Sequence, residues 1–127
     1  MNTLNYFGRE EIQCKCHCNI YNVEEGHIEI LNQIRTEIGR AMWVTSGCRC
    51  PDHNDAVGGA DNSGHITTET NPCTEYDIYC VSGGFRYDLV GLCYKYKVPR
   101  IGVYYSSPIV HIGFSNLLPQ GTMWVMK

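Results

Sequence analysis

The sequence lacks a long hydrophobic run, and no stretch of it approaches the length that crosses a membrane. Residues 1–11 have no apolar core of the kind found in secretory signal peptides, so we expect no export by that route. Charge is also scarce. Charged residues make up 18% of the chain and the net charge is -3, which gives no footprint for nucleic acid or an anionic membrane. We therefore expect neither nucleic acid nor membrane among the partners.

The composition that remains is that of a folded protein. Hydrophobic residues account for 43% of the 127 residues, which is enough to bury one core. Residues 1–127 are therefore expected to form a single domain.

Helical and strand patterns alternate along the chain. Apolar residues at helical spacing predict an amphipathic helix over residues 24–39, where Gly39 provides the stop. A second helix is predicted from Ser82, as its cap, to about Lys97. Residues 46–64, rich in Gly, Asn, Asp and Pro, are predicted to form a long surface loop. Strands are predicted at 42–45, 75–81, 101–104, 109–114 and, at an edge, 123–126. This order favours an α+β fold with a small antiparallel sheet and flanking helices.

Four short motifs contain residues able to bind a metal or an anion. They are SGCRCPDHN at Ser46–Asn54, SGH at Ser63–His65, YDI at Tyr76–Ile78 and VHI at Val110–Ile112. Two histidines and one aspartate are the protein ligands of an open zinc site, which leaves a position for water or substrate. His65, Asp77 and His111 are the candidate ligands, and Arg49 would supply a fixed cation for a substrate carboxylate.

These motifs resemble those of the Hedgehog/D-Ala-D-Ala peptidase superfamily, in particular the small phage and bacterial zinc peptidoglycan carboxypeptidases of the peptidase M15 type. The patterns of that group are SGxRxPxHN, SxHxxGxAxD and (V/I)H(V/I)D, and residues 6–18 are similar to its N-terminal segment, so the resemblance covers essentially the whole chain. It implies one catalytic zinc on His65, Asp77 and His111. It also implies that Arg49 grips the terminal carboxylate of a peptidoglycan stem peptide, and that Ser63 hydrogen-bonds the peptide or a group around the metal.

The sequence departs from those patterns in its spacing. Asp77 lies twelve residues after His65, whereas the superfamily places its aspartate seven residues after the histidine. A five-residue insertion within residues 67–74 would restore the match, with Asn71 and Pro72 as its turn.

A second departure concerns the general base that a zinc peptidase needs. The superfamily supplies a carboxylate a few residues before its last histidine or two residues after it. Residues 104–110 contain no acidic side chain, and Gly113 stands two residues after His111. The catalytic residue is therefore unknown. Glu75 is the candidate base, and Glu69 and Asp88 are further acidic residues that could replace the lost carboxylate.

The eight cysteines leave three alternatives open. They could be reduced and packed as small apolar residues, or joined in disulfides, which synthesis in the cytosol disfavours. A second, structural zinc site could also form from Cys14, Cys16 and Cys18 with Cys48 or Cys50. Their alternating spacing differs from the usual C-x-x-C pattern of such sites.

The sequence thus predicts a zinc-dependent peptidoglycan peptidase of phage type, either a D,D- or L,D-carboxypeptidase or an endopeptidase, weakened by loss of the usual carboxylate. It would be an endolysin in the host cytoplasm or a virion protein, acting at the bacterial cell wall. The alternative is a non-catalytic protein with the DD-peptidase fold, a virion structural or cell-wall-binding component with other virion proteins as partners. Fold alone does not separate the two.

Overall fold

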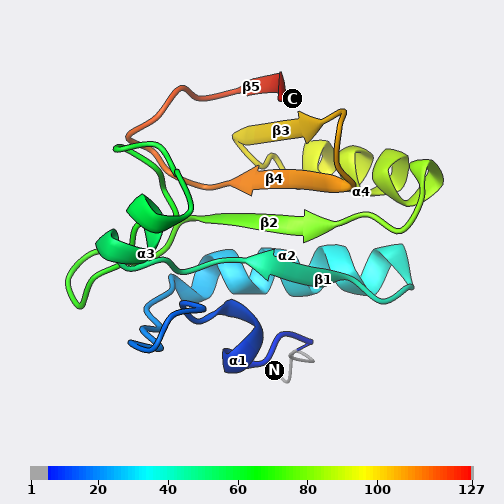
Figure 1. Cartoon of the computed structure of the whole chain (residues 1–127). Coiled ribbons are helices and arrows are strands. Elements are labelled where there is room, and N and C mark those ends of the chain that lie inside the picture. The colour runs from blue at the N-terminus through cyan, green and yellow to red at the C-terminus, as the bar shows by residue number, and fades with distance from the viewer. Residues whose placement is uncertain (1–5, 127) are drawn as a thin grey trace.

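A five-stranded sheet forms the centre of the computed structural model, which describes residues 6–126 (Figure 1). The strands lie in the order β1-β2-β4-β3-β5. The elements are α1 (Arg9–Ile12), α2 (Glu25–Ile38), β1 (Trp43–Ser46), α3 (Pro51–Ala56), β2 (Glu75–Tyr79), α4 (Gly83–Lys95), β3 (Arg100–Tyr104), β4 (Ile109–Gly113) and β5 (Thr122–Met126).

The α+β fold predicted from the sequence is confirmed, with one difference in the sheet. The pairs β1–β2, β2–β4 and β3–β4 are antiparallel, but β5 runs parallel to β3. The sheet is therefore mixed. The segment between β4 and β5 returns the chain to the end of the sheet where β3 begins, so that Thr122 pairs with Arg100. Two strands can pair in parallel only if the chain crosses back to the same end of the sheet before the second strand begins. The length of the connecting loop does not show whether the chain makes this crossing.

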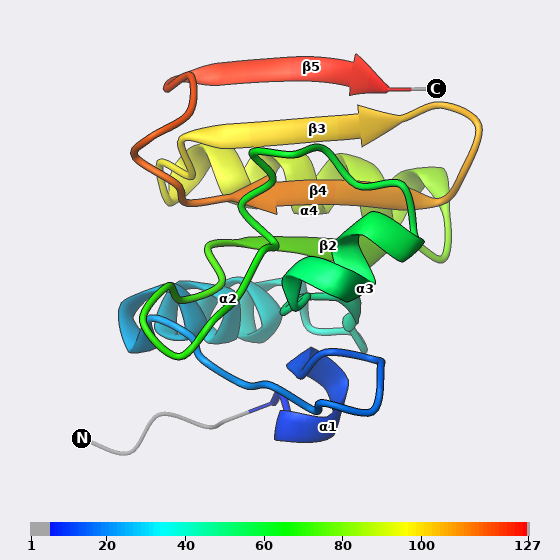
Figure 2. The same ribbon diagram turned by 60° about the vertical axis from the view of Figure 1, so that its left-hand side comes forward.

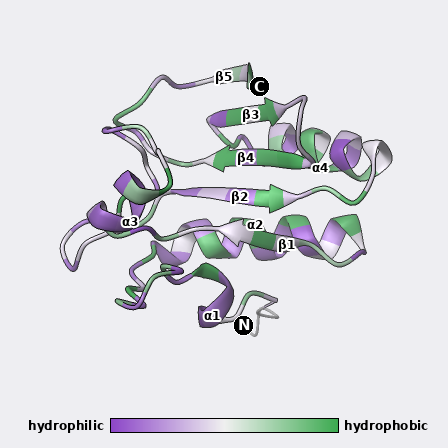
Figure 3. Ribbon diagram, viewed as in Figure 1, coloured by the Kyte–Doolittle hydropathy of each residue, from purple (hydrophilic) through white to green (hydrophobic). Residues whose placement is uncertain are grey.

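The two faces of the sheet have different chemistry, as alternation along a strand requires. Tyr76 and Ile78 of β2, with Val110 and Ile112 of β4, are fully buried on one face. Helices α2 and α4 cover that face, while α3 and the loop that follows it cross the opposite one (Figure 2). Hydrophobic colour dominates β4, whereas α3 is hydrophilic (Figure 3). The side chains on the second face are thus free to form a polar site.

The two long helices begin and end where the sequence predicts. Gly39 caps α2 in the left-handed region at φ 67°, and its N–H donates to Arg35 O. At α4, Ser82 Oγ accepts a hydrogen bond from Phe85 N at 3.1 Å. Each helix turns its apolar side to the core, with Leu31 of α2 and Leu89 of α4 fully buried.

The predicted loop over residues 46–64 was wrong in part, because it contains the short helix α3. Pro51 occupies the first turn of α3, and Cys50 caps it by accepting from His53 N at 3.4 Å. A helix of six residues is too short to show a 3.6-residue period, so its Pro, Asp and Asn content was interpreted as loop. Ser46 also belongs to β1 rather than to the loop.

No helix within residues 6–126 combines the length and apolar character needed to span a bilayer. All eight cysteines are free, and Cys48, Cys73, Cys80 and Cys93 belong to the buried core.

Candidate metal centre and substrate pocket

The candidate site follows one row of residues across the sheet. Asp77 of β2 pairs directly with His111 of β4, and His111 pairs on its other side with Gly102 of β3. Gly102 in turn pairs with Trp124 of β5, and Ser46 of β1 pairs with Asp77. Neighbouring residues in such a row have their side chains on the same face. The register of the sheet alone therefore brings Asp77 and His111 together.

His65 reaches this row from the loop before β2. Gly64 and Thr74, just before β2, lie side by side, since Thr74 N donates to Gly64 O at 3.0 Å. The excursion between them has its exposed turn at Thr68–Asn71, where Thr68 N donates to Asn71 O at 3.0 Å. Residues 65–73, where the sequence predicts an insertion, thus form a closed bulge, and His65 at its start lies beside Asp77.

The ring of His65 is buried and oriented by the backbone. Its Nδ1 lies 2.7 Å from Gly47 O, which favours the tautomer with the proton on Nδ1. Its Nε2 is buried, 3.4 Å from Asp77 Oδ2, and makes no hydrogen bond with any residue in the range 6–126. A buried nitrogen lone pair without a partner is costly unless something else binds it.

His111 lies between two carboxylates. Its Nδ1 is 2.9 Å from Asp77 Oδ1, and its Nε2 is hydrogen-bonded to Glu75 Oε1. Burial disfavours the charged form of His111, but the hydrogen bonds and negative charges of Asp77 and Glu75 outweigh burial and raise its pKa to about 9. Burial alone would raise the pKa of the Asp77 carboxyl. The hydrogen bonds and positive charges of His111 and His65 outweigh burial and hold that pKa well below its usual range. The two carboxylates thus favour a positive charge on or beside the His111 ring.

The donor set fits zinc. One ligand atom each from His65, Asp77 and His111 lies within 4.8 Å of the other two. Two imidazole nitrogens and a carboxylate oxygen are ordinary zinc donors, and three protein ligands leave an open position. The unpartnered Nε2 of His65 has the lone pair that a metal would bind, and Gly47 holds the other nitrogen as outer partners of zinc histidines do.

Glu75 enters the site through a slot between two glycines. It pairs in register with Gly113, and a Cβ at position 113 would lie 2.9 Å from Glu75 Cδ and Oε2. A Cβ on Gly64 would overlap Glu75 Cγ. Arg100 pairs with Gly113 from the other side, and its Nε donates to Glu75 Oε2 at 2.8 Å. Burial would raise the pKa of Glu75, but the hydrogen bonds and positive charges of His111 and Arg100 lower it overall, so the carboxylate stays ionised.

Arg49 is held in place by its own motif. Its Nε donates to Ser46 Oγ at 3.2 Å and its Nη1 to Asn54 Oδ1 at 3.0 Å. Its Nη2 lies 3.7 Å from Asp77 Oδ2. A Cβ on Gly59 would overlap Asn54 and lie 2.7 Å from Arg49 Nη1, so this approach requires glycine at position 59. A guanidinium fixed on two sides is well placed to bind a carboxylate.

A pocket of about 860 Å³ opens over these residues. Arg49, His65 and His111 line it, as do Ser63 and Trp124. Ser63 Oγ accepts from His65 N at 3.1 Å, so it supports the loop that carries His65. Trp124 stacks near Arg100, 4.8 Å from guanidinium carbon to ring centroid, and forms an aromatic wall.

Among the described residues, Glu75 is the only acidic one that lines this pocket. Asp88, on α4, forms an ion pair with Arg40, and Glu69 lies in the exposed bulge. Neither of these two alternative carboxylates is near the site, which leaves Glu75 as the carboxylate available to it.

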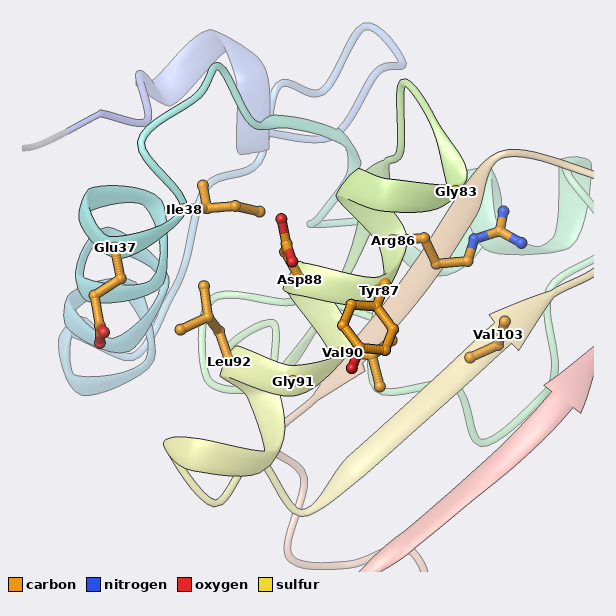
Figure 4. Close-up of a pocket in the computed structure, with 10 residues that line it drawn as sticks. All are labelled: Glu37, Ile38, Gly83, Arg86, Tyr87, Asp88, Val90, Gly91, Leu92 and Val103. Carbon is orange, nitrogen blue, oxygen red and sulfur yellow. The ribbon is translucent and has the colours of Figure 1, made fainter.

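A second hollow lies on the helix-covered side of the sheet, between α2, α4 and β3 (Figure 4). Tyr87, Leu92 and Val103 are among the residues that line it, as is Asp88, whereas Arg49 and the three candidate metal ligands do not. It therefore plays no part in the metal centre.

Two residues of the site were not predicted from the sequence. Arg100 lies at the start of β3 and was not assigned to the site, although its charge before an apolar strand was visible. Trp124 reaches His111 only because Gly102 has no side chain: a Cβ there would lie 2.8 Å from the Trp124 ring. The parallel pairing of β5 with β3 creates this contact, and no short pattern marks it.

Comparison with known families agrees with this geometry. The sequence matches the family described as Peptidase M15 over residues 5–113, and the chain belongs to that family. Members of this family are zinc-dependent peptidases that act on peptidoglycan, and this chain has groups that could hold a metal ion. No curated protein matches the chain closely enough to serve as a relative. The matched segment contains all three candidate ligands and Arg49, and it ends before β5.

Proposed function

We propose that this protein is a zinc-dependent peptidase of peptidoglycan stem peptides, with the metal held by His65 Nε2, Asp77 and His111 Nδ1. The observation that carries the proposal is the convergence of these three donors within 4.8 Å, with the buried Nε2 of His65 lacking a partner among the described residues. Zinc in an open site polarises a scissile carbonyl and makes water a nucleophile at neutral pH.

Arg49 binds the free carboxylate of the substrate in this proposal. It lines the same pocket as His65 and His111, and its Nη2 lies 3.7 Å from Asp77 Oδ2. Because Ser46 and Asn54 already fix the guanidinium, little side-chain entropy is lost when a carboxylate binds. A stem-peptide carboxylate bound by Arg49 would bring the last peptide bond of that peptide close to the metal ligands, as a carboxypeptidase requires.

The contacts of Glu75 are compatible with two roles, as a partner that orients His111 and as the general base. Oε1 is hydrogen-bonded to His111 Nε2, and a proton held there would leave Nδ1, beside Asp77, as the nitrogen that binds the metal. Such a carboxylate partner orients a metal-bound histidine and increases its basicity. Glu75 is also the only acidic residue among those described around the pocket, so it is the candidate for moving the proton.

The first experiment measures hydrolysis of D,D- and L,D-stem peptides, with and without an attached glycan, by zinc-loaded protein. His65→Ala, Glu75→Gln and the chelated wild type are compared in parallel, with zinc content measured for each. We expect cleavage by the wild type and none by His65→Ala or the chelated sample. A Glu75→Gln variant that keeps zinc but loses about 10²–10⁴-fold in rate would assign Glu75 as the base. A loss of zinc affinity with little loss of rate at saturating zinc would assign it as the partner that positions His111.

A second function is favoured by the commitment of both Glu75 oxygens, one to His111 and one to Arg100. A carboxylate that already accepts a hydrogen bond on each oxygen from a positively charged partner is a weaker base, because both partners stabilise its ionised form. The alternative is accordingly a non-catalytic, cell-wall-binding or virion structural protein that keeps the metal centre. Retained binding of stem peptides without any cleavage, in zinc-loaded protein, would select this alternative.

We also propose that the protein is a phage enzyme, which is either released from the host cytoplasm or carried by the virion. The neighbouring genes test it. A holin gene beside this one would favour lysis, whereas tail or capsid genes would favour a virion component.

A further inference from the structure

Four of the eight cysteines gather at one place outside the pocket. Cys14, Cys16 and Cys18 follow α1, and Cys50 is the residue before α3. The backbone brings the two segments together, since Cys48 N donates to Ile12 O at 2.8 Å. The segment with the three cysteines is a series of bends and a turn rather than a strand, so the alternating spacing does not place them on a flat face.

The four sulfurs have the geometry of a metal-binding cluster. All lie within 4.8 Å of one another, and Cys16 Sγ is central. Its distances to the other sulfurs are 3.4 Å to Cys14, 3.2 Å to Cys18 and 3.5 Å to Cys50. A zinc ion bound by four thiolates at its usual bond length sets sulfur atoms about 3.8 Å apart. The three separations from Cys16 Sγ are somewhat shorter than that value, and the other three are at most 4.8 Å.

Backbone N–H groups point at these sulfurs. Cys50 N donates to Cys14 Sγ at 3.3 Å, Cys18 N to Cys16 Sγ at 3.4 Å, and His53 N to Cys50 Sγ at 3.4 Å. Three sulfurs of the cluster thus receive a hydrogen bond from the main chain. Donors of this kind balance thiolate charge and fix the orientation of metal ligands.

The structure decides between the two fourth residues left open by the sequence. Cys48 is buried in the core and its thiol contacts Asn22 O at 3.7 Å, away from the cluster. Cys50 contacts Cys16 instead. We propose that Cys14, Cys16, Cys18 and Cys50 bind a structural zinc ion, separate from the centre at His65, Asp77 and His111.

Such an ion would connect the N-terminal segment to the substrate loop. Cys50 is adjacent to Arg49 and caps α3, and Lys15, inside the cysteine segment, lines the substrate pocket. With four ligands the ion has no open position, so its contribution is to hold α1 and the Arg49 loop together. This inference concerns a different set of residues from the proposed catalytic centre and does not depend on activity.

The test counts zinc and identifies its ligands. Purified under reducing conditions, the wild type is expected to bind one equivalent of zinc more than Cys16→Ser and one more than His65→Ala, measured by mass spectrometry of the metal. Cys48→Ala is the matched control, a neighbouring buried cysteine outside the cluster, and should keep the full count. The His65→Ala protein loaded with Co²⁺ should show thiolate charge-transfer absorption and the strong visible bands of tetrahedral cobalt.

Three results would overturn the proposal. One is a Cys16→Ser protein with the same zinc content as the wild type. Another is a Co²⁺ spectrum of His65→Ala without thiolate bands. The third is an intact mass showing that the four cysteines form disulfides in freshly purified, metal-supplied protein. The spectrum needs no variant within the cluster, so it remains decisive if Cys16→Ser does not fold.

Discussion

Replacing Glu75 by Ala and Gly113 by Asp, singly and together, tests whether the Glu75 carboxylate depends on the space that Gly113 leaves. Glu75 and Arg100 meet over Gly113 because that residue has no side chain to separate them. We predict that Gly113→Asp destabilises the wild type but stabilises a Glu75→Ala background. The sign of its effect should therefore change with the residue at position 75.

The magnitudes follow from the contacts. In the wild type, the new Cβ would lie 2.9 Å from both Arg100 Cβ and Glu75 Cδ, and overpacking of this kind costs about 1–3 kcal/mol. Glu75→Ala removes the acceptor of two buried donors, on His111 and Arg100, at a cost of about 3–5 kcal/mol. Asp at position 113 is then two residues from His111 on the same face, with the vacated slot open to it. Recovery of about half that loss is expected, as a coupling between neighbouring sites.

Urea unfolding of the four proteins, each with and without zinc, measures these differences. For a chain of this size about 1 kcal/mol corresponds to a shift in Tm of about 4 °C, so thermal unfolding provides a second readout. Gly113→Ala is the control for size without charge, and it should destabilise both backgrounds less than Asp does the wild type. An equal effect of Gly113→Asp in the two backgrounds would refute the reasoning.

Three further predictions address the pocket and the core. Arg49→Lys should raise KM for stem peptides with a free carboxylate by about tenfold or more, because a point charge replaces a two-pronged donor; substrates with an amidated end should show no such change. Trp124→Ala should weaken substrate binding, measured by KM, while Met123→Ala, on the opposite face of β5, should not. Burial lowers the pKa of His27 more than Glu24 raises it, so this residue makes folding less favourable as pH falls below about 6.5. Because His27→Phe removes the titrating group, the Tm of this variant should fall less than that of the wild type between pH 8 and pH 5. Parallel Tm curves for the two proteins would contradict this prediction.

The parts of the fold that could be predicted are those with local signals. Helix α2 carries its own stop at Gly39, and α4 its own cap at Ser82, so both ends are encoded by neighbouring residues. Helix α3 has too few residues for a period, and its cap is the sulfur of Cys50, which is not a usual cap. The parallel position of β5 depends on where the chain returns, which no local pattern specifies.

The candidate site divides in the same way. Arg49, His65 and His111 lie in recognisable motifs, and the structure places them at one pocket. The position of Glu75 depends on three elements at once: β2 presents it, while Gly64 and Gly113 leave room for it. A sequence does not show which side chain will occupy the space beside a glycine. The contact of Glu75 with Gly64 and Gly113 could therefore be found only from the structure.

The row of paired residues from Ser46 to Trp124 contains two candidate metal ligands and one aromatic pocket residue, which come from different parts of the sequence. The three candidate ligands lie within the segment shared with the Peptidase M15 family, whereas the aromatic wall of the pocket comes from β5, beyond residue 113. Metal binding and the shape of the pocket rim are thus carried by different stretches of sequence. Substitutions in β5 would accordingly change the aromatic wall of the pocket without replacing any of the three candidate metal ligands.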